Sequence, residues 1–322
     1  MRLAAIDLGT VTSRLLVADI IQGKVREQRR SMVITHLGED LHKTDMIGKK
    51  AIDREVDACK AFLSTIQEVE EADGHPVERI YAIATSAMRD AKNREEVLER
   101  LHEAGVDIKV ISGQREAQLS FRGAISGFSQ ERLIPGKPVV TIDVGGGSTE
   151  VILGLFEPMD PRVQILDTRS FDIGSRRVTD SFIHADPPAQ KEISQARSWI
   201  TAQMSGYLQQ LRGRPQAVIA VAGTATTAVT VVKGISEYDP WKVHGTKITA
   251  HELDWLLAKL SALDLKERSK VTGLEPGRAP VIVGGLLVLQ CALDLLGLNA
   301  FIVSETDILQ GLLLDGASHE ER

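Results

Sequence analysis

Apolar residues in the first 33 positions gather into three short runs separated by glycine and polar residues. Leu3 to Asp7 is the first run, and residues 14–20 and 24–33 follow it, the last two joined through Gln22-Gly23. Runs of this length, bounded by turn-forming residues, predict β-strands. The chain therefore begins with three consecutive predicted strands.

After these strands, stretches of helical spacing alternate with further short apolar runs. In residues 51–72 apolar side chains recur every three or four positions, which indicates one buried helix face. Alternating strands and helices predict an α/β architecture in which helices cover the sheets. Further helices are predicted over 93–102, 113–128, 190–211 and 279–298 and from about 307, and further strands over 79–84, 108–111, 163–173, 217–221 and 300–303.

Residues 138–154 combine a strand pattern with a concentration of glycine. β-Branched residues lead to Asp143, three glycines stand at Gly145, Gly146 and Gly147, and Ser148-Thr149-Glu150 begins a second apolar run. This pattern predicts strand, tight turn and strand, with a carboxylate at each end of the turn. Glycines let a ligand approach the backbone and let consecutive N–H groups point at it, which suits a phosphate. Asp143 and Glu150 would then hold the divalent cation that accompanies a polyphosphate.

The glycine turn differs from two common nucleotide-binding motifs. No lysine follows the glycines at the spacing of a P-loop. A dinucleotide-binding motif that began at Gly145 would need its third glycine at position 150, where the chain has Glu150, and it would lead into a helix. The turn therefore belongs to neither motif.

A shorter version of the same pattern occurs near the N-terminus. Ile6-Asp7-x-Gly9-Thr10 matches Ile142-Asp143-x-Gly145-Gly146, and the two stretches lie too far apart in the chain for a solenoid repeat, which indicates two related domains. By itself, the turn at Asp7 is also compatible with an ordinary β-hairpin. Its pairing with the second turn, and with Gly223-Thr224 after another buried strand, favours phosphate binding.

We expect a domain boundary in the loop 130–137, which contains Pro135 and Gly136. The predicted domains are residues 1–130, joined by the last helix over about 307–322, and residues 131–306. Two Asp-x-Gly hairpin turns, one per domain, resemble the phosphate-binding device of the actin, Hsp70 and sugar-kinase superfamily. This resemblance implies two related ribonuclease H-like domains with an interdomain cleft.

Composition indicates the class of protein, the partners to exclude and the cellular compartment to expect. The 322 residues are long enough for two domains, and a hydrophobic content of 43% is ordinary for a globular protein. A net charge of −6 argues against nucleic acid or an anionic membrane as the main partner. The N-terminus becomes polar at Asp7, too early for a signal peptide, and Cys59 and Cys291 lie in helical apolar patterns as expected for buried free thiols. We therefore expect a cytoplasmic protein.

Several motifs together resemble one family, the Ppx/GppA phosphatases, which are exopolyphosphatases and guanosine pentaphosphate phosphohydrolases. They occur in the family's order and cover essentially the whole chain, which resembles the short, two-domain form. The matching stretches are Ile6-Asp-Leu-Gly-Thr10 with Arg14-Leu15, Ala84-Thr-Ser-Ala-Met-Arg-Asp-Ala-Lys-Asn93, Ser112-Gly-Gln-Arg-Glu-Ala117, Asp143-Val-Gly-Gly-Gly-Ser-Thr-Glu150, Gly223-Thr224, Tyr238-Asp-Pro-x-x-Val-His-Gly245 and Arg278-Ala279.

The resemblance implies a catalytic role for Glu116, in the first turns of a predicted helix, and also for Glu150. A carboxylate at Glu116 can accept a proton from water, whereas a solvated glutamate at a helix start is the ordinary alternative. Asp143 and Glu150 match the metal-binding carboxylates, and Asp7 is expected to contact the metal or its waters. Oxygen ligands and phosphate suit Mg²⁺ or another divalent cation. Backbone and hydroxyl donors to the phosphates are expected from Gly9, Thr10, Gly145, Gly146, Gly147, Ser148, Gly223 and Thr224.

Three arginines are candidates for binding the anion through their forked donors: Arg14, Arg89 and Arg278, each within a matching motif. A solvated surface position is the alternative for each of them. The Arg176-Arg177 pair has no matching motif and is a weaker candidate. We interpret His244 as structural or substrate-lining, because it has no serine or cysteine partner in the sequence.

The chain departs from the family pattern at a few positions. Val11 replaces an asparagine, Pro280 replaces an acid, and Asp307-Ile-Leu-Gln-Gly311 replaces Gly-Leu-Arg-Glu-Gly. These changes bear on chain-length preference and guanosine recognition, and they leave Glu116 and the metal-binding carboxylates in place.

The prediction from the sequence is an enzyme, a phosphoric anhydride hydrolase of exopolyphosphatase type that acts on inorganic polyphosphate. The close alternative is hydrolysis of guanosine pentaphosphate (pppGpp) with the same chemistry. A kinase of the same superfamily and a non-catalytic polyphosphate or nucleotide sensor are two competing hypotheses. No nucleic acid or membrane partner is expected, and the sequence leaves room for a homodimer.

Overall fold

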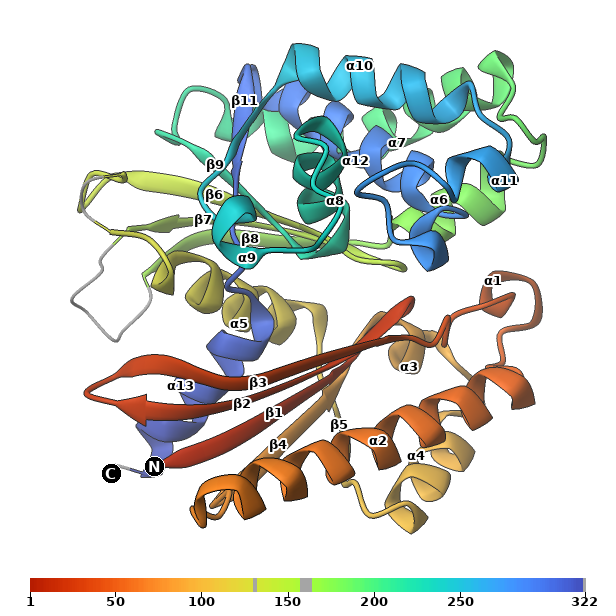
Figure 1. Ribbon diagram of the computed structural model, residues 1–322. Helices are drawn as coiled ribbons and strands as arrows, with labels where there is room; N and C mark the ends of the chain where they lie inside the picture. The colour runs from red at the N-terminus through yellow and green to blue at the C-terminus, as the bar shows by residue number, and fades with distance from the viewer. Residues whose placement is uncertain (130–131, 157–163, 321–322) are drawn as a thin grey trace. The chain divides into compact units, whose positions relative to one another are not determined.

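The computed structural model describes residues 1–129, 132–156 and 164–320 and divides the chain into two compact units (Figure 1). Unit 1 is Met1–Ser126 together with Asp307–Arg322, and unit 2 is Gly127–Thr306. Gln130 in the predicted boundary loop and Val163, the first residue of a predicted strand, lie outside the described residues. The chain thus passes from unit 1 to unit 2 and returns to unit 1 for its last helix.

Unit 1 contains a five-stranded sheet in the described residues, in the order β3-β2-β1-β4-β5. The first three strands form antiparallel neighbours, while β4 and β5 run parallel to β1. The consecutive hairpins follow from the short turns between the first apolar runs. The strands are β1 (Arg2–Leu8), β2 (Thr12–Ile21), β3 (Lys24–Ile34), β4 (Arg79–Ala84) and β5 (Lys109–Val110).

Helices cover both faces of this sheet, as the fully buried strand β1 requires. Ala4 and Ile6 point into a core with α2 (Lys49–Asp73) and α4 (Arg94–Glu103), whereas Leu3 and Ala5 point into a second core with α5 (Gly113–Ser126) and α13 (Ile308–Glu320). The short helices α1 (Leu41–Thr44) and α3 (Ser86–Asp90) lie in the connections.

Gly123 serves the packing of α5 against α13. A Cβ at Gly123 would lie 1.6 Å from the carbonyl oxygen of Asp307, and one at Gly311 would lie 1.9 Å from that of Leu119. Small residues at this crossing therefore let two helix backbones approach each other. The glycine at 123 is explained by this contact.

Unit 2 contains a six-stranded sheet in the described residues, in the order β10-β11-β9-β6-β7-β8. Alternate residues of β6 and β7 enter a large core with α7 (Gln190–Leu211) and α12 (Ile282–Leu296), which Figure 1 shows above the sheet together with α10. The strands are β6 (Pro138–Val144), β7 (Thr149–Leu155), β8 (Ile165–Phe171), β9 (Val218–Val221), β10 (Lys247–Thr249) and β11 (Ala300–Val303). The remaining helices are α6 (Ser175–Phe182), α8 (Ala222–Val232), α9 (Pro240–Val243), α10 (Ala250–Ser261), α11 (Leu265–Arg268) and the 3₁₀ turn Pro276–Arg278.

The two sheets share one topology. The order β8-β7-β6-β9-β11 repeats β3-β2-β1-β4-β5, with the same antiparallel and parallel neighbours, and β10 is added at the edge. Three antiparallel strands followed by two parallel ones is the ribonuclease H-like arrangement. The predicted α/β class with two related ribonuclease H-like domains is confirmed.

Most predicted elements are present, with small shifts at their ends. The predicted helix over 190–211 and strand over 300–303 match their bounds, and the buried helix predicted over 279–298 is α12. Asn93 precedes α4 without a side-chain cap, because its amide instead pairs with the backbone of Ile47. Among the described helices, none combines the length and hydropathy needed to cross a membrane.

Both cysteines are buried free thiols, as predicted. Burial raises the pKa of Cys59 to about 12 and also raises the pKa of Cys291. Neither thiol is therefore ionised to any extent at neutral pH.

Glu55 on α2 makes the stability of the protein depend on pH. This side chain is fully buried, and burial raises its pKa to about 7 despite nearby Ser13 and Thr35. The unfolded chain ionises it near pH 4.5, so the folded state holds more protons between pH 4.5 and 7. We expect its contribution to the free energy of unfolding to be complete below pH 4.5 and to be lost as pH rises through 7, by roughly 3 kcal/mol in all.

Urea denaturation between pH 4.5 and 8 measures this change. Glu55→Gln should flatten the profile over that range, whereas Glu68→Gln, an exposed position on the same helix, should leave it unchanged. Equal slopes for the wild-type protein and Glu55→Gln would contradict the assignment.

Candidate functional site

The first glycine turn, Gly9 to Thr12, connects β1 with β2 in unit 1. The amide of Gly9 donates to the carbonyl of Thr12 at 3.1 Å and closes the turn. The segment that follows β3 then contacts the turn from one side. Gly38 N–H donates to the carbonyl of Thr10 at 2.9 Å, and the N–H groups of Thr35 and His36 donate to that of Val11 at 3.0 and 2.9 Å.

The second turn, Gly145 to Ser148, is built in the same way between β6 and β7 of unit 2. The amide of Gly145 donates to the carbonyl of Ser148 at 3.0 Å. The segment that follows β8, where α6 begins, supplies the donors on one side. Ser175 N–H donates to Gly145 at 2.9 Å, Arg176 and Arg177 N–H donate to Gly146 at 2.8 and 3.1 Å, and Arg177 Nε donates to Gly147 at 2.9 Å.

These contacts determine where the other N–H groups of each turn point. In a trans peptide the carbonyl and the following N–H point in opposite directions. Because the carbonyls of Gly145, Gly146 and Gly147 face α6, the N–H groups of Gly146, Gly147 and Ser148 point away from it. In the first turn the N–H groups of Val11 and Thr12 are oriented likewise. Successive N–H groups pointing to one side form an anion-binding concavity.

Gly174 permits the approach of α6 to the second turn. A Cβ at this position would lie 2.4 Å from the carbonyl carbon of Gly146, closer than any side chain tolerates. Only glycine therefore lets the start of α6 reach the glycine carbonyls. The residue pattern did not predict this element, although the Arg176-Arg177 pair was a signal for it.

Asp143 and Glu150 stand directly opposite each other on β6 and β7. Directly opposite residues of an antiparallel pair place their side chains on one face, with Cβ atoms about 5 Å apart. Both side chains are buried, and Ser170 Oγ donates to Glu150 Oε1 at 2.7 Å. Two buried carboxylates on one face repel each other unless a cation lies beside them.

A divalent cation fits this pair of oxygen donors. Among the described residues no group of three or more acidic, histidine or cysteine side chains could hold a metal ion. Mg²⁺ is commonly bound by only one or two protein carboxylates, and water and substrate phosphate complete its ligands. The Asp143–Glu150 pair matches that donor set.

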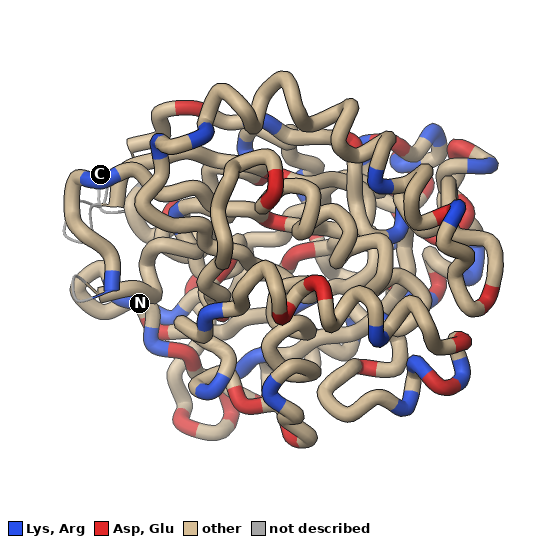
Figure 2. The backbone as a smooth tube through the Cα atoms, turned by 90° about the horizontal axis from the view of Figure 1, so that it is seen from above, with Lys and Arg blue, Asp and Glu red and all other residues tan. Residues whose placement is uncertain are grey.

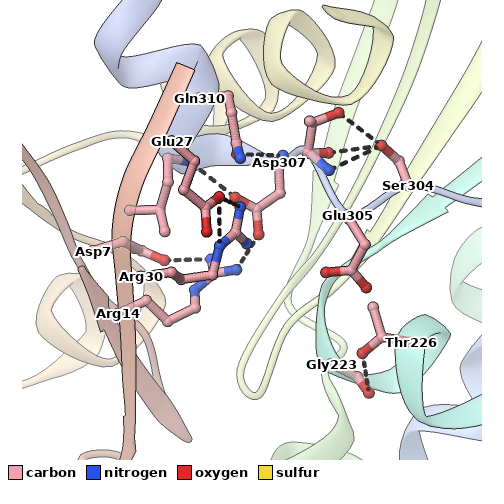
Figure 3. A network of polar contacts seen from close by, with 12 residues as sticks. Asp7, Arg14, Glu27, Arg30, Gly223, Thr226, Ser304, Glu305, Asp307 and Gln310 are labelled. Atoms are coloured by element: carbon pink, nitrogen blue, oxygen red, sulfur yellow. Dashed lines mark hydrogen bonds and ion pairs between the residues drawn. The ribbon is translucent and has the colours of Figure 1, made fainter. Parts of the chain in front are cut away.

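The corresponding place in unit 1 holds an ion pair. Asp7 stands opposite Arg14 on β1 and β2, and Arg14 corresponds to Glu150 by the same offset that relates Asp7 to Asp143. Arg14 donates to Asp7 Oδ2 at 2.5 Å and also binds Asp307 at the start of α13 (Figure 3). Unit 1 therefore has an arginine where unit 2 has a second carboxylate.

Burial and Arg14 have opposite effects on the pKa of the Asp7 side chain. Burial raises the pKa of Asp7, and the positive charge of Arg14 lowers it in opposition. Its Oδ1 atom has no hydrogen-bond partner among the described residues. One oxygen of Asp7 is thus engaged by Arg14, and the other remains for a water or a ligand.

Glu116 lies in the first turn of α5 in unit 1 and is largely buried. Arg89, from α3, donates from Nη1 to Glu116 Oε2 at 2.6 Å and to the carbonyl of Ile111 at 3.2 Å. A charge-assisted hydrogen bond of this length holds the carboxylate in one orientation. Arg89, predicted as a phosphate ligand, therefore contacts the predicted catalytic glutamate.

Gly223, Thr224 and Arg278 come together in unit 2 although Arg278 is distant from the other two in the sequence. A Cβ at Gly223 would lie 1.6 Å from Arg278 Nη1, so the guanidinium lies directly over this glycine at the start of α8. Ala222, just before it, has a left-handed backbone with φ of 65°. β9 runs parallel to β6 with Val221 beside Asp143, so its end lies next to the second turn.

Gly223→Ala tests the contact between this glycine and Arg278. The methyl group should displace the guanidinium and weaken the binding of orthophosphate by about 10-fold, the loss of one charge-assisted hydrogen bond. Titration calorimetry measures the affinity. Gly206→Ala, on α7 where a Cβ meets nothing within 4 Å, should leave phosphate binding unchanged and serves as the control.

The predicted site residues therefore form three groups within the units. Unit 1 holds Asp7, Gly9, Thr10 and Arg14 at its first turn, and Arg89 with Glu116. Unit 2 holds Asp143, Glu150 and the turn Gly145–Ser148, with Gly223, Thr224 and Arg278 at the neighbouring strand end. His244 has structural contacts: it stacks on Phe128 and bonds to the carbonyl of Gly127 at 2.9 Å.

Charged positions are distributed over both units. Figure 2 shows lysine and arginine interspersed with aspartate and glutamate along the backbone. With a net charge of −6, local pairs and clusters decide where an anion is bound.

Comparison with known proteins shows that the chain is similar to phosphatases. The model of the Ppx/GppA phosphatase family matches residues 16–320. Exopolyphosphatase 2 of Mycobacterium tuberculosis is 32% identical over 97% of this chain and 98% of its own length, and Exopolyphosphatase 1 of Mycobacterium bovis is 29% identical over 98% of this chain and 88% of its own length.

Solved structures agree with the sequence comparison. An exopolyphosphatase-like protein has a TM-score of 0.90 at 30% identity, covering 100% of this chain and 99% of its own. The Ppx/GppA family member of Aquifex aeolicus has a TM-score of 0.78 at 28% identity, with the same coverage of both chains.

Proposed function

Because the chain belongs to the Ppx/GppA phosphatase family and is a phosphoric anhydride hydrolase, we propose that it is an exopolyphosphatase that releases terminal orthophosphate from inorganic polyphosphate. The two mycobacterial relatives described above, matched over nearly the whole chain, carry that name. The observation that carries the proposal is the pair Asp143 and Glu150 beside a glycine turn whose N–H groups point to one side. A carboxylate pair with such a turn suits a metal-bound phosphate.

In the proposed reaction Glu116 is the general base. Its carboxylate accepts a proton from water while the water oxygen forms a bond to the terminal phosphorus, and the bridging P–O bond breaks. The bridging oxygen, with its electron pair, leaves on the shortened chain, and orthophosphate is released. Arg89 supports this role because its hydrogen bond holds the Glu116 carboxylate in one orientation.

Each of the two turns, and the start of α8, is proposed to bind phosphate. Gly9, Thr10, Gly145, Gly146, Gly147, Ser148, Gly223 and Thr224 supply backbone and hydroxyl donors. Arg278 is favoured as a direct ligand because its guanidinium lies at Gly223. Arg14 and Arg89 bind carboxylates, so we propose that they share their charge between those carboxylates and the phosphate.

Mg²⁺ is the proposed cofactor, and Asp143 and Glu150 are its proposed protein ligands. Asp7 would contact the metal or its waters through Oδ1. When bound, the ion would neutralise charge on the terminal phosphates, while the protein's own residues orient the phosphate and take the proton. Preorganised donors and positioning should account for most of the rate gain, as in other phosphoryl transfers.

Direct assay of orthophosphate release tests the function. Purified protein is incubated with long-chain polyphosphate or with pppGpp, each with Mg²⁺ or with excess chelator. We expect Mg²⁺-dependent release from polyphosphate that exceeds release from pppGpp. A preference for pppGpp would instead establish the second activity, and ADP-forming transfer from ATP to an acceptor would point to kinase chemistry.

A further inference from the structure

Arg177, on α6, contacts the second turn through its side chain as well as its backbone. Its N–H donates to the carbonyl of Gly146 at 3.1 Å, and its guanidinium Nε donates to the carbonyl of Gly147 at 2.9 Å. The Gly147 carbonyl belongs to the same peptide unit as the N–H of Ser148. The side chain therefore lies behind one of the donors that point toward the proposed phosphate.

In the first turn, backbone N–H groups make the contact that the Arg177 side chain makes in the second turn. Val11 corresponds to Gly147 when the two turns are aligned on Asp7 and Asp143, and its carbonyl accepts from two backbone N–H groups, those of Thr35 and His36. Those residues are held in turn by Arg54, which donates from Nε to the carbonyl of Thr35 at 2.6 Å. In unit 2 the equivalent carbonyl is held by an arginine side chain directly.

A guanidinium on this carbonyl has two consequences for the turn. It fixes the plane of the Gly147–Ser148 peptide, to which the flexible Gly147 would otherwise give more freedom to rotate. It also polarises that peptide, so that the Ser148 N–H becomes a stronger donor. Both effects preorganise the turn for anion binding.

We propose that Arg177 is a positioning residue of the second phosphate-binding turn, which acts by holding the Gly147 carbonyl so that the Ser148 N–H faces the substrate phosphate. The role rests on the proposed function of that turn. Through Arg177, α6 would then take part in the reaction. The Arg176-Arg177 pair, which matches no motif in the sequence, would contribute through this side chain. Gly174 belongs to the same device, because it lets α6 reach the turn.

Four variants test the role: Arg177→Ala, Arg177→Gln, Arg177→Lys and, as the control, Arg169→Gln. Arg169 is an arginine of β8 whose guanidinium lies over the rings of Phe171 and Tyr207. The assay uses whichever of polyphosphate or pppGpp the wild-type enzyme hydrolyses, and orthophosphate serves as a competitive inhibitor. Thermal unfolding reports on stability in parallel.

We expect Arg177→Ala to lower kcat/KM by about 10- to 100-fold, as small displacements of positioned groups do, and to raise KM and the inhibition constant of orthophosphate together. Arg177→Lys keeps a cationic N–H donor and should recover part of the loss. Added methylguanidinium should restore part of the activity of Arg177→Ala, which a purely structural role would not predict. Arg169→Gln should match the wild-type enzyme.

Unchanged kcat/KM and orthophosphate inhibition in Arg177→Ala would overturn the role, given an active wild-type enzyme. A wild-type protein inactive on both phosphoanhydrides would instead overturn the proposed function. If Arg177→Ala does not fold, the activities of Arg177→Lys and Arg177→Gln are compared to test the positioning role. Higher activity in the lysine variant supports the role, and equal or lower activity contradicts it.

Discussion

Replacing Glu116 by Gln should lower kcat for orthophosphate release by about 10²- to 10⁴-fold, the usual contribution of a general base. The amide has the same shape as the carboxylate but cannot accept the proton of the attacking water. It still offers an oxygen to Arg89, so the start of α5 should keep its structure. Steady-state kinetics and equilibrium binding of polyphosphate separate the two effects, and we expect affinity to change by less than about threefold.

Glu95→Gln is the matched control for this substitution. Glu95 also lies in the first turn of a helix of unit 1, but it is exposed. Its variant should show wild-type kinetics. Near-full activity of Glu116→Gln would remove Glu116 from the mechanism.

The second large effect is expected from Asp143→Asn. Loss of one of the two opposed carboxylates should raise the Mg²⁺ concentration needed for half-maximal activity and lower the maximal rate at least about 10²-fold. Stability gives a readout that does not depend on activity. In the wild-type protein Mg²⁺ should raise the unfolding temperature because it binds only the folded state, whereas in Asp143→Asn this increase should be absent.

Without metal the same variant should be no less stable than the wild-type protein, since removing one like charge relieves repulsion between opposed side chains. Asp172→Asn, an exposed position that follows β8, is the control and should keep the full response to Mg²⁺. A normal Mg²⁺-dependent increase in the unfolding temperature of Asp143→Asn would show that the ion binds elsewhere.

The local parts of the site could be predicted because they depend on neighbouring residues. Short β-branched and apolar runs on both sides of Gly145–Gly147 suffice to place Asp143 and Glu150 on adjacent strands, and the repeated Asp-x-Gly pattern at Asp7 indicates the second copy. The helix that carries Glu116 follows from its apolar spacing and from Ser112-Gly113 before it. These features need no knowledge of how the strands are ordered.

The roles of the arginines could not be predicted in this way. Arg14 is predicted from its motif to bind phosphate, but its ion pair with Asp307 depends on α13 returning to unit 1 from the far end of the chain. Arg177 matches no motif, and its contact with the second turn arises because β8 places the start of α6 against that turn. A residue of the same type is a ligand, a support or a surface charge according to which segment packs beside it.

The sequence by itself determined the two strand–turn–strand units, their carboxylates and the glutamate on the helix, because backbone periodicity and turn chemistry are local properties. Only the tertiary structure decided which side of each glycine turn is supported and therefore toward which side the N–H groups point. It also decided that a carboxylate pair stands in unit 2 where unit 1 has Asp7 with Arg14. These outcomes depend on strand order and on contacts between segments far apart in the chain, which residue spacing does not encode.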